Sequence, residues 1–177
     1  LSKNFKQGSY GAGCGATTAT LKGGQGSSSW IQKISNGEEY TIGALVINNA
    51  VGNPLLNEGP HFLSGFLEFE NEFGGYGASS ENYDHILRAK RVPPSLGLSN
   101  TLNNIASNTV IAVIATDAPV TRANLKRMAM MAHDGIAKSL SPAHTPMDRD
   151  TIFAISSNEV INKEVLENAD ILALGAR

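Results

Sequence analysis

Apolar positions in the second half of the chain repeat with two different periods. Residues 109–116, TVIAVIAT, form a β-branched apolar run, which predicts a strand. Residues 121–140 carry apolar side chains three or four positions apart behind a candidate N-cap at Thr121, which predicts a helix. Residues 151–156 predict another short strand. Residues 163–174 predict a second amphipathic helix, whose inward side chains would be Val165, Leu166, Ala169 and Leu172. Strands that alternate with helices indicate a layered α/β or α+β fold.

The first half of the chain predicts a hairpin behind a glycine-rich segment. Residues 28–34 alternate in polarity, residues 35–37 (Ser-Asn-Gly) carry the Asn-Gly signal of a tight turn, and residues 40–48 predict the returning strand. The apolar run ALVI in the returning strand is typical of a strand covered on both faces. Residues 8–26 are so rich in glycine that we expect a loop, whose backbone another group approaches closely.

Residues 54–108 show no sustained period beyond a possible short helix at 83–90. Stretches of this length without regular structure are uncommon inside a compact domain, and they are usually functional or linkers. The 177 residues fit one domain, but the chain starts without Met and residues 170–177 resemble the middle of a helix. We therefore expect part of a longer protein, truncated at both ends.

Composition excludes several classes of partner. Hydrophobic residues at 41%, charged residues at 17% and a net charge of -2 give no electrostatic reason to expect nucleic acid or an anionic membrane as a partner. No run approaches the ~20 apolar residues of a membrane-spanning helix. The single cysteine, Cys14, excludes an internal disulfide and fits a reducing compartment, so we expect a cytoplasmic protein.

The glycine-rich segment contains two patterns that could suggest nucleotide binding. Residues 11–16 satisfy G-x-G-x-x-A, but that motif has its mechanical meaning only between a hydrophobic strand and a helix, and residues 1–10 predict no such strand. Residues 23–27 lack the lysine and hydroxyl pair of a phosphate-binding loop. Cys14 could be a nucleophile, but a lone cysteine is more typically a small buried residue. We expect no nucleotide site here.

Two histidines and three aspartates could be imagined as metal ligands. His133 and His144 precede Asp148 and Asp150, and Asp134 follows His133. Their spacing lacks the regular pattern of a zinc site. A solvated or hydrogen-bonded role for His133 and a loop-shaping role for His144 are the simpler interpretations.

A different chemistry is suggested by Asn108-Thr109 at the start of one predicted strand and by Asp148 and Asp150 before another. A hydroxyl is a poor nucleophile until its proton is removed, and an N-terminal threonine can use its own α-amine or a nearby acid-base group. From these residues alone, a simpler alternative stays open. Thr109 would merely start a strand, and the aspartates would form a solvated turn.

Residues 108–156, from NTVIAVIATDAP to SPAHTPMDRDTIFAIS, resemble the opening of the β chain in the DmpA-type aminopeptidases. That family includes L-aminopeptidase/D-esterases, β-peptidyl aminopeptidases and, more distantly, nylon-oligomer hydrolases. GAGCGATTATLKGGQGSSS at residues 11–29 and IGALVINNAVGNP at residues 42–54 resemble the end of the family's α chain. The similarity leaves out mainly the stretch at 54–106.

The resemblance implies an αββα four-layer sandwich, which ornithine acetyltransferase shares, formed by a precursor that cleaves itself. The Asn108-Thr109 bond would be the cleavage site, in the Asn-Thr context of the nylon-oligomer branch. Residues 1–108 would then be the C-terminal part of an α chain, and residues 109–177 the N-terminal part of a β chain. Thr109 would be the nucleophile, and no cofactor is implied.

The resemblance also implies partners for Thr109. Asp148 matches a hydroxyl or carboxyl residue that assists the nucleophile, and Asp150 matches an acidic residue that orients or deprotonates. Asn49 matches an asparagine that stabilises the oxyanion. Lys22 matches a lysine that keeps the amine neutral or supports the oxyanion. The aminopeptidase-type members carry serine and then glutamate at the two acidic positions, so proton transfer and substrate preference are expected to differ here.

The implied function is an autocatalytic hydrolase that acts on amide or ester bonds beside a free amino group. Its substrates would be peptides, amino-acid amides or esters, and it would form a homo-oligomer of αβ units. Two alternatives stay open: an acyltransferase like ornithine acetyltransferase, and an uncleaved, non-catalytic protein that binds a ligand through its glycine-rich loop. The family's first α-chain segment, which contributes a tyrosine near the substrate, is absent from this sequence.

Overall fold

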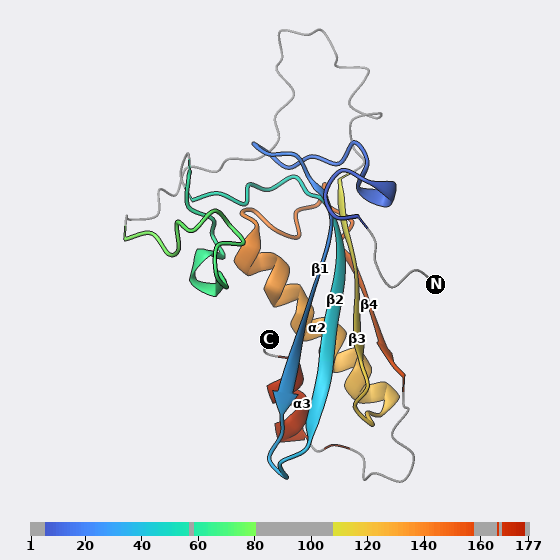
Figure 1. The fold of residues 1–177 in the computed structure, drawn as a ribbon. Coiled ribbons are helices and arrows are strands. Elements are labelled where there is room, and N and C mark those ends of the chain that lie inside the picture. The colour runs from blue at the N-terminus through green and yellow to red at the C-terminus, as the bar shows by residue number, and fades with distance from the viewer. Residues whose placement is uncertain (1–5, 57–58, 81–107, 158–165, 167, 176–177) are drawn as a thin grey trace, which may run out of the picture.

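The computed structural model describes residues 6–56, 59–80, 108–157, 166 and 168–175 (Figure 1). Its elements are the 3-10 turn η1 (Gly11–Gly13), β1 (Gly24–Lys33), β2 (Glu39–Asn49), the 3-10 turn η2 (Gly65–Leu67), β3 (Thr109–Thr116), α2 (Arg122–Ser139), β4 (Thr151–Ser156) and α3 (Asn168–Gly175). The strands form one sheet in the order β1-β2-β3-β4. β1 and β3 both run antiparallel to β2, and β4 runs parallel to β3. Helix α2 is the crossover that parallel pairing requires.

The predicted hairpin is confirmed at its turn and extended at its start. The Ile34 and Glu38 backbones are joined by a hydrogen bond of 2.9 Å, and Gly37 has φ 89°, a conformation that favours glycine. β1 begins at Gly24 rather than near residue 28, because Gly24 pairs with Asn48 across the sheet. Strand pairing uses backbone hydrogen bonds, so glycines can take part in it. The glycine-rich loop therefore ends before residue 24 rather than at residue 26.

Two glycines of that segment are required by close backbone contacts, as the sequence predicted. A Cβ on Gly13 would lie 2.4 Å from the Gln25 nitrogen, and one on Gly23 would lie 2.1 Å from the Asn48 carbonyl oxygen. Both distances are far below van der Waals contact. The partners are neighbouring segments of the same chain, so these glycines let the N-terminal segment pack tightly on the first two strands.

Helix α2 begins and ends where its sequence predicts. The Thr121 hydroxyl accepts a hydrogen bond from the Asn124 backbone nitrogen at 3.1 Å, which satisfies one of the unpaired donors of the first turn. Met128, Ile136 and Leu140 are buried along one stripe of the helix. This stripe faces the sheet, and α2 makes its main strand contact with β4.

Helix α3 is shorter than predicted and turned differently. It begins at Asn168, whereas residues 163–165 of the predicted helix lie outside the described residues. Ile171 is 2% exposed and Leu172 is 61% exposed, so Ile171 faces the core where Leu172 was expected to. The buried carboxylate of Asp170 fixes this register, since it accepts hydrogen bonds from the Ser35 backbone nitrogen and hydroxyl.

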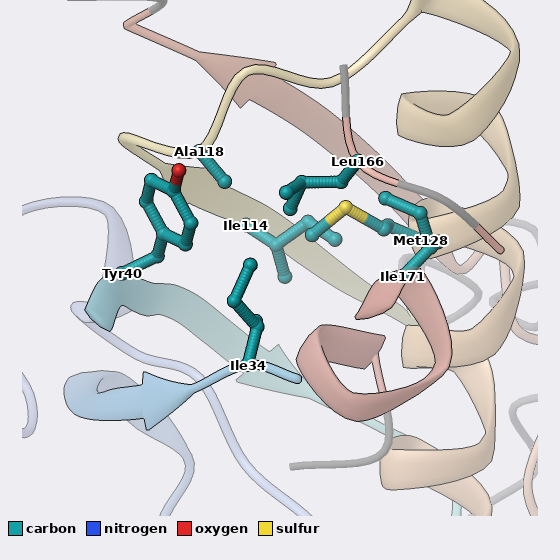
Figure 2. Close-up of a cluster of buried hydrophobic side chains, with 7 residues drawn as sticks. All are labelled: Ile34, Tyr40, Ile114, Ala118, Met128, Leu166 and Ile171. Carbon is teal, nitrogen blue, oxygen red and sulfur yellow. The ribbon is translucent and has the colours of Figure 1, made fainter. Parts of the chain in front are cut away.

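The larger core cluster lies between the sheet and both helices (Figure 2). Ile114 of β3, Met128 of α2 and Ile171 of α3 point toward one another in this view. Ile34, Tyr40, Ala118 and Leu166 complete the cluster. A second cluster, Ala50, Val110, Ile136 and Leu140, packs nearer the other end of α2. Both clusters lie on the same side of the sheet.

The opposite face of the sheet is apolar and exposed in the described residues. Along β3, buried residues alternate with more exposed ones, of which Ile111 is 41% exposed. Along β4, Phe153 and Ile155 are 56% and 54% exposed. The described helices therefore cover one face of the sheet. The ALVI run predicted that both faces are covered, and the described residues include no segment that covers the second face. We call this surface the open face. No helix in the described ranges is long and apolar enough to cross a membrane.

The irregular segment after β2 carries few regular elements where it is described. Residues 54–56 and 59–80 contain bends, isolated bridges and η2. The Glu68 carboxylate accepts backbone hydrogen bonds from Phe73, Gly75 and Gly77, which closes the loop 68–77. The possible helix at 83–90 lies outside the described residues.

Candidate active site around the Asn108-Thr109 bond

The Asn108-Thr109 bond lies at the end of the sheet where β2 ends and β3 and β4 begin, at the top of Figure 1. Thr109 is the residue opposite Asn49 in the β2–β3 register. Asn108 forms an isolated parallel bridge with Asp148, just before β4. The sheet topology therefore brings Asn49, Asp148 and Asp150 next to this bond, although nearly 60 residues separate Asn49 from Thr109.

The hydroxyl of Thr109 lies against the carbonyl group that it would attack. Its Oγ1 donates a hydrogen bond of 2.5 Å to the Asn108 carbonyl oxygen. The same oxygen accepts a hydrogen bond from the Arg149 backbone nitrogen at 3.2 Å. The Arg149 N–H thus polarises the carbonyl of the candidate bond and is placed to stabilise developing negative charge on its oxygen, while the hydroxyl that would attack lies beside that carbonyl.

The side chains around the bond divide between the two faces of the sheet. Val110 is buried on the helix side, so the Thr109 side chain lies on the open face, as does that of its pair Asn49. Asn108 is buried on the helix side, and Asp148 is its bridge partner. The two aspartates therefore approach the backbone from the helix side, while the hydroxyl and Asn49 share the open face.

The carboxamide of Asn49 is oriented by the glycine-rich segment. Its Oδ1 accepts a hydrogen bond from the Thr17 backbone nitrogen at 3.1 Å. The Thr17 N–H can only donate, so the side-chain atom that it contacts must be the oxygen of Asn49. The donor group of the carboxamide, Nδ2, therefore points in another direction. A donor opposite Thr109 is what an oxyanion site requires.

Lys22 stands at the end of the tight turn that positions Thr17. Thr17 and Lys22 form an isolated antiparallel bridge, so the lysine belongs to the same turn that holds Asn49. The Lys22 side chain is exposed, and its amine makes no hydrogen bond or ion pair within the described ranges. The structure therefore brings Lys22 to the neighbourhood of Asn49 without placing its charge on Thr109.

Asp148 joins three segments of the site. Its Oδ1 accepts a hydrogen bond from the Val51 backbone nitrogen at 3.0 Å, and its Oδ2 accepts one from the Thr145 hydroxyl at 2.9 Å. Val51 follows β2, and Thr145 belongs to the loop between α2 and β4. Asp148 thus fixes the chain that leaves Asn49 and does not contact the Thr109 hydroxyl directly.

Asp150 holds the main chain directly after Thr109. Its Oδ1 accepts a hydrogen bond from the Val110 backbone nitrogen at 2.9 Å. Its Oδ2 lies 2.7 Å from His144 Nδ1, and its side chain is 4% exposed. The carboxylate is therefore buried, and both of its oxygens have partners.

Three contributors were not singled out as site residues by the sequence: the Thr17 and Arg149 backbone nitrogens and the His144 side chain. A backbone donor leaves no residue-type signal, so its role depends on which strands pair. His144 could have been suspected from its proximity to Asp150 in the sequence. The loop-shaping interpretation was incomplete, because its ring contacts both Asp150 and the His133 carbonyl.

The other candidate chemistries find little geometric support. Within the described residues, no group of three or more His, Cys, Asp or Glu side chains is arranged to hold a metal ion. Cys14 is exposed, so the expectation of a small buried residue was wrong; it follows η1 on the surface of the N-terminal segment. The G-x-G-x-x-A pattern coincides with that 3-10 turn rather than with the start of an α-helix.

Comparison with known proteins identifies the family. Residues 1–176 match the model of peptidase family S58. The chain belongs to this family. The resemblance to the DmpA-type aminopeptidases is thereby confirmed, because this S58 match covers all but the last residue of the chain.

Individual S58 relatives agree with this assignment. An uncharacterized aminopeptidase of Mycobacterium bovis is 35% identical over 153 residues, which are 86% of this chain and 41% of the relative. A 6-aminohexanoate-oligomer endohydrolase of Kocuria is 34% identical over 55 residues, 31% of this chain and 16% of that enzyme. The chain therefore spans about two fifths of the length of the aminopeptidase relative.

A solved structure shows the fold. The L-aminopeptidase D-Ala-esterase/amidase of Ochrobactrum anthropi, described as a new variant among the Ntn hydrolase folds, matches with a TM-score of 0.60 and 23% identity. The match covers 99% of this chain and 43% of that protein. The predicted fold class is confirmed, and the described residues supply a mixed sheet and the helices on one of its faces.

Proposed function

We propose that this S58 chain is part of a self-cleaving amide hydrolase whose nucleophile is Thr109. The observation that carries the proposal is the contact between Thr109 Oγ1 and the carbonyl group of Asn108, which also accepts the Arg149 N–H. Family membership and the names of the relatives support amide-bond chemistry. On this proposal, residues 1–108 end the α chain and residues 109–177 begin the β chain.

Self-cleavage would use the geometry of the uncleaved bond. Thr109 Oγ1 attacks the Asn108 carbonyl carbon, and the negative charge on the carbonyl oxygen is stabilised by the Arg149 N–H. The C–N bond then breaks, and the proton given up by the attacking hydroxyl passes to the nitrogen, which becomes the free α-amine of Thr109. Water hydrolyses the resulting ester, which releases the Asn108 carboxylate and restores the Thr109 hydroxyl.

Substrate hydrolysis would repeat the same steps on an external amide or ester. The new α-amine accepts the hydroxyl proton, the substrate acyl group transfers to Thr109 Oγ1, and the leaving amine departs with a proton. Asn49 is proposed to donate to the oxyanion from the open face, where it lies opposite Thr109. Asp148 and Asp150 are proposed to position the main chain on either side, and Lys22 to add positive charge at the rim.

The proposed substrate class is that suggested by the names of the relatives. The aminopeptidase and oligomer-hydrolase names of the relatives favour peptides, amino-acid amides or esters with a free amino group, or short oligoamides. We also propose a homo-oligomer of αβ units in the cytoplasm. Size-exclusion chromatography with light scattering tests the oligomer.

Intact mass of the full-length protein tests the central claim. Wild type is expected to separate into two chains at the Asn108-Thr109 bond, whereas Thr109→Ala stays whole and hydrolyses no aminoacyl nitroanilide. Thr41→Ala is a matched control, since Thr41 is an exposed threonine at the far end of β2. An unbroken wild-type chain, or cleavage and activity in Thr109→Ala, would contradict the proposal.

The same preparation separates the two alternative functions. An acyltransferase would move the acetyl group of acetylornithine to glutamate with negligible hydrolysis. A non-catalytic protein would stay whole and bind its ligand equally well after Thr109→Ala. Neither alternative predicts both a break before Thr109 and hydrolysis of aminoacyl amides.

A further inference from the structure

His144 contacts the candidate site more extensively than the loop-shaping role expected from the sequence requires. Its Nδ1 lies 2.7 Å from Asp150 Oδ2, and its Nε2 lies 3.2 Å from the carbonyl oxygen of His133 in α2. The other Asp150 oxygen accepts the Val110 N–H at 2.9 Å. A continuous series of hydrogen bonds therefore runs from α2 to the peptide group that joins Thr109 to Val110.

The backbone at His144 supports a specific role for the ring. Its φ is 53°, in the left-handed region that residues other than glycine rarely adopt. The ring also packs edge-on against that of His133, with centroids 4.9 Å apart. The surrounding contacts thus hold His144 in an uncommon backbone conformation, with its ring between Asp150 and α2.

The chemistry of the two contacts defines what the ring must supply. A carboxylate oxygen and a carbonyl oxygen only accept hydrogen bonds, so both contacts are satisfied together when both ring nitrogens donate. The ring nitrogen that faces Asp150 lies against a carboxylate whose side chain is 4% exposed. A buried carboxylate without a charged or donating partner is costly and tends to take a proton or move.

We propose that His144 is a positioning residue for Thr109, acting through Asp150. The ring contacts Asp150 Oδ2 and holds the other carboxylate oxygen on the Val110 N–H, which sets the peptide plane after Thr109. That plane determines where the Thr109 hydroxyl lies relative to the Asn108 carbonyl and where the new α-amine points. This inference rests on the proposed function, because it assigns the series of contacts to the nucleophile of that reaction.

A pair of nearly isosteric substitutions separates the hydrogen bond from the backbone conformation. His144→Asn keeps a donor close to the position of Nδ1, and His144→Asp has the same shape but can only accept and faces a like charge. Asn and Asp both tolerate left-handed backbone. His144→Gly controls for backbone strain, and His133→Ala removes the ring contact but keeps the carbonyl.

The experiment follows self-cleavage of the freshly refolded full-length precursor by intact mass. The cleavage step is unimolecular, so a partly unfolded variant loses amplitude, whereas a mispositioned hydroxyl lowers the rate constant. We expect His144→Asp and His144→Gly to lower the rate constant by about 10- to 100-fold, since small displacements of reacting groups have effects of that size. His144→Asn should recover most of the rate, and His133→Ala should stay near wild type.

The outcomes distinguish this inference from the function beneath it. Wild-type cleavage together with unchanged rates in His144→Asp and His144→Gly would overturn the role of His144 and leave Thr109 as nucleophile. Equal slowing in His144→Asn and His144→Asp would also overturn it, because the donor would then be irrelevant. If His144→Gly fails to fold, the Asn and Asp pair still decides. A wild-type chain that never cleaves would overturn the proposed function itself.

Discussion

At the scale of single residues, the candidate site depends on which side-chain atoms already form hydrogen bonds to the backbone. Asn49 accepts a hydrogen bond from the Thr17 backbone through Oδ1, which orients its Nδ2 donor. Asp148 and Asp150 use their oxygens on backbone nitrogens of Val51 and Val110. The candidate polar residues therefore divide into Asn49, which is proposed to act on the substrate, and two aspartates that hold the main chain.

Asn49→Ala tests the first of these roles. We expect the hydrolysis rate of the mature enzyme to fall by about 100-fold or more, because removal of one preorganised oxyanion donor has effects of that size. Asn48→Ala is a matched control, since Asn48 lies on the other face of β2 and its Oδ1 accepts from the Ala50 backbone. Steady-state kinetics on an aminoacyl nitroanilide measures both. Equal activity of the two variants would exclude an oxyanion role for Asn49.

At the scale of elements, local sequence signals and long-range contacts contribute differently to stability. Helix α2 carries its own N-cap at Thr121, and its buried stripe follows from its periodicity. The loop 68–77 has no regular structure and is closed by the Glu68 carboxylate. The local sequence pattern thus determines the limits and the buried stripe of α2, whereas the Glu68 carboxylate holds the loop 68–77 closed.

Thr121→Ala should lower the free energy of unfolding by about 1 kcal/mol, because the Asn124 backbone nitrogen loses its acceptor. Thr121→Ser, which keeps the hydroxyl, should lose much less. Chemical denaturation of the full-length protein measures the difference. A loss in Thr121→Ser as large as in Thr121→Ala would show that the cap is not responsible.

The loop 68–77 should open in acid. The Gly75 N–H, against a smaller opposing effect of desolvation and with help from Gly77 and Phe73, lowers the pKa of Glu68 below its usual 4.5. A depressed folded-state pKa stabilises the closed loop above the unfolded pKa, and that contribution is lost as pH falls through the folded value. The protection of the Gly75 and Gly77 amides, measured as exchange relative to the intrinsic rate at each pH, should therefore decrease below pH 4.5, and in Glu68→Gln it should be low already at neutral pH.

At the scale of the whole molecule, the sheet has one covered and one open face. Ile111, Phe153 and Ile155 expose apolar side chains on the open face, and Thr109 lies on that face too. An apolar surface of this kind on a sheet is a packing surface. Since the chain spans about two fifths of its aminopeptidase relative, a second sheet of the αββα sandwich is expected to cover it.

Phe153→Ala tests this cover. In the full-length protein the substitution should lower the free energy of unfolding by about 3 kcal/mol, as for a phenylalanine in a core. In residues 1–177 alone, where the ring is exposed, the effect should stay within about 0.5 kcal/mol. Equal small effects in both proteins would show that the open face remains solvent-exposed.

The sequence by itself predicted most of the elements, and the family resemblance supplied Thr109 as the proposed nucleophile. The hairpin turn, the β3 strand, the limits of α2 and the β4 strand all follow from periodicity, turn residues and a cap, which act over a few residues. The family resemblance predicted that Thr109, Asn49, Asp148 and Asp150 share one site, and strand pairing brings all four to one end of the sheet. By contrast, the register of α3 was wrong, because the contact between Asp170 and Ser35 spans 135 positions.

Tertiary structure decided how the candidate site residues are arranged. Strand pairing places Asn49 opposite Thr109 on one face and brings both aspartates to the other, and no local pattern encodes that division. The donors from Thr17 and Arg149 belong to the backbone, so residue type cannot reveal them. The link from His144 through Asp150 to Val110 exists because α2 crosses behind the strands, a consequence of packing that the order of residues along the chain does not show.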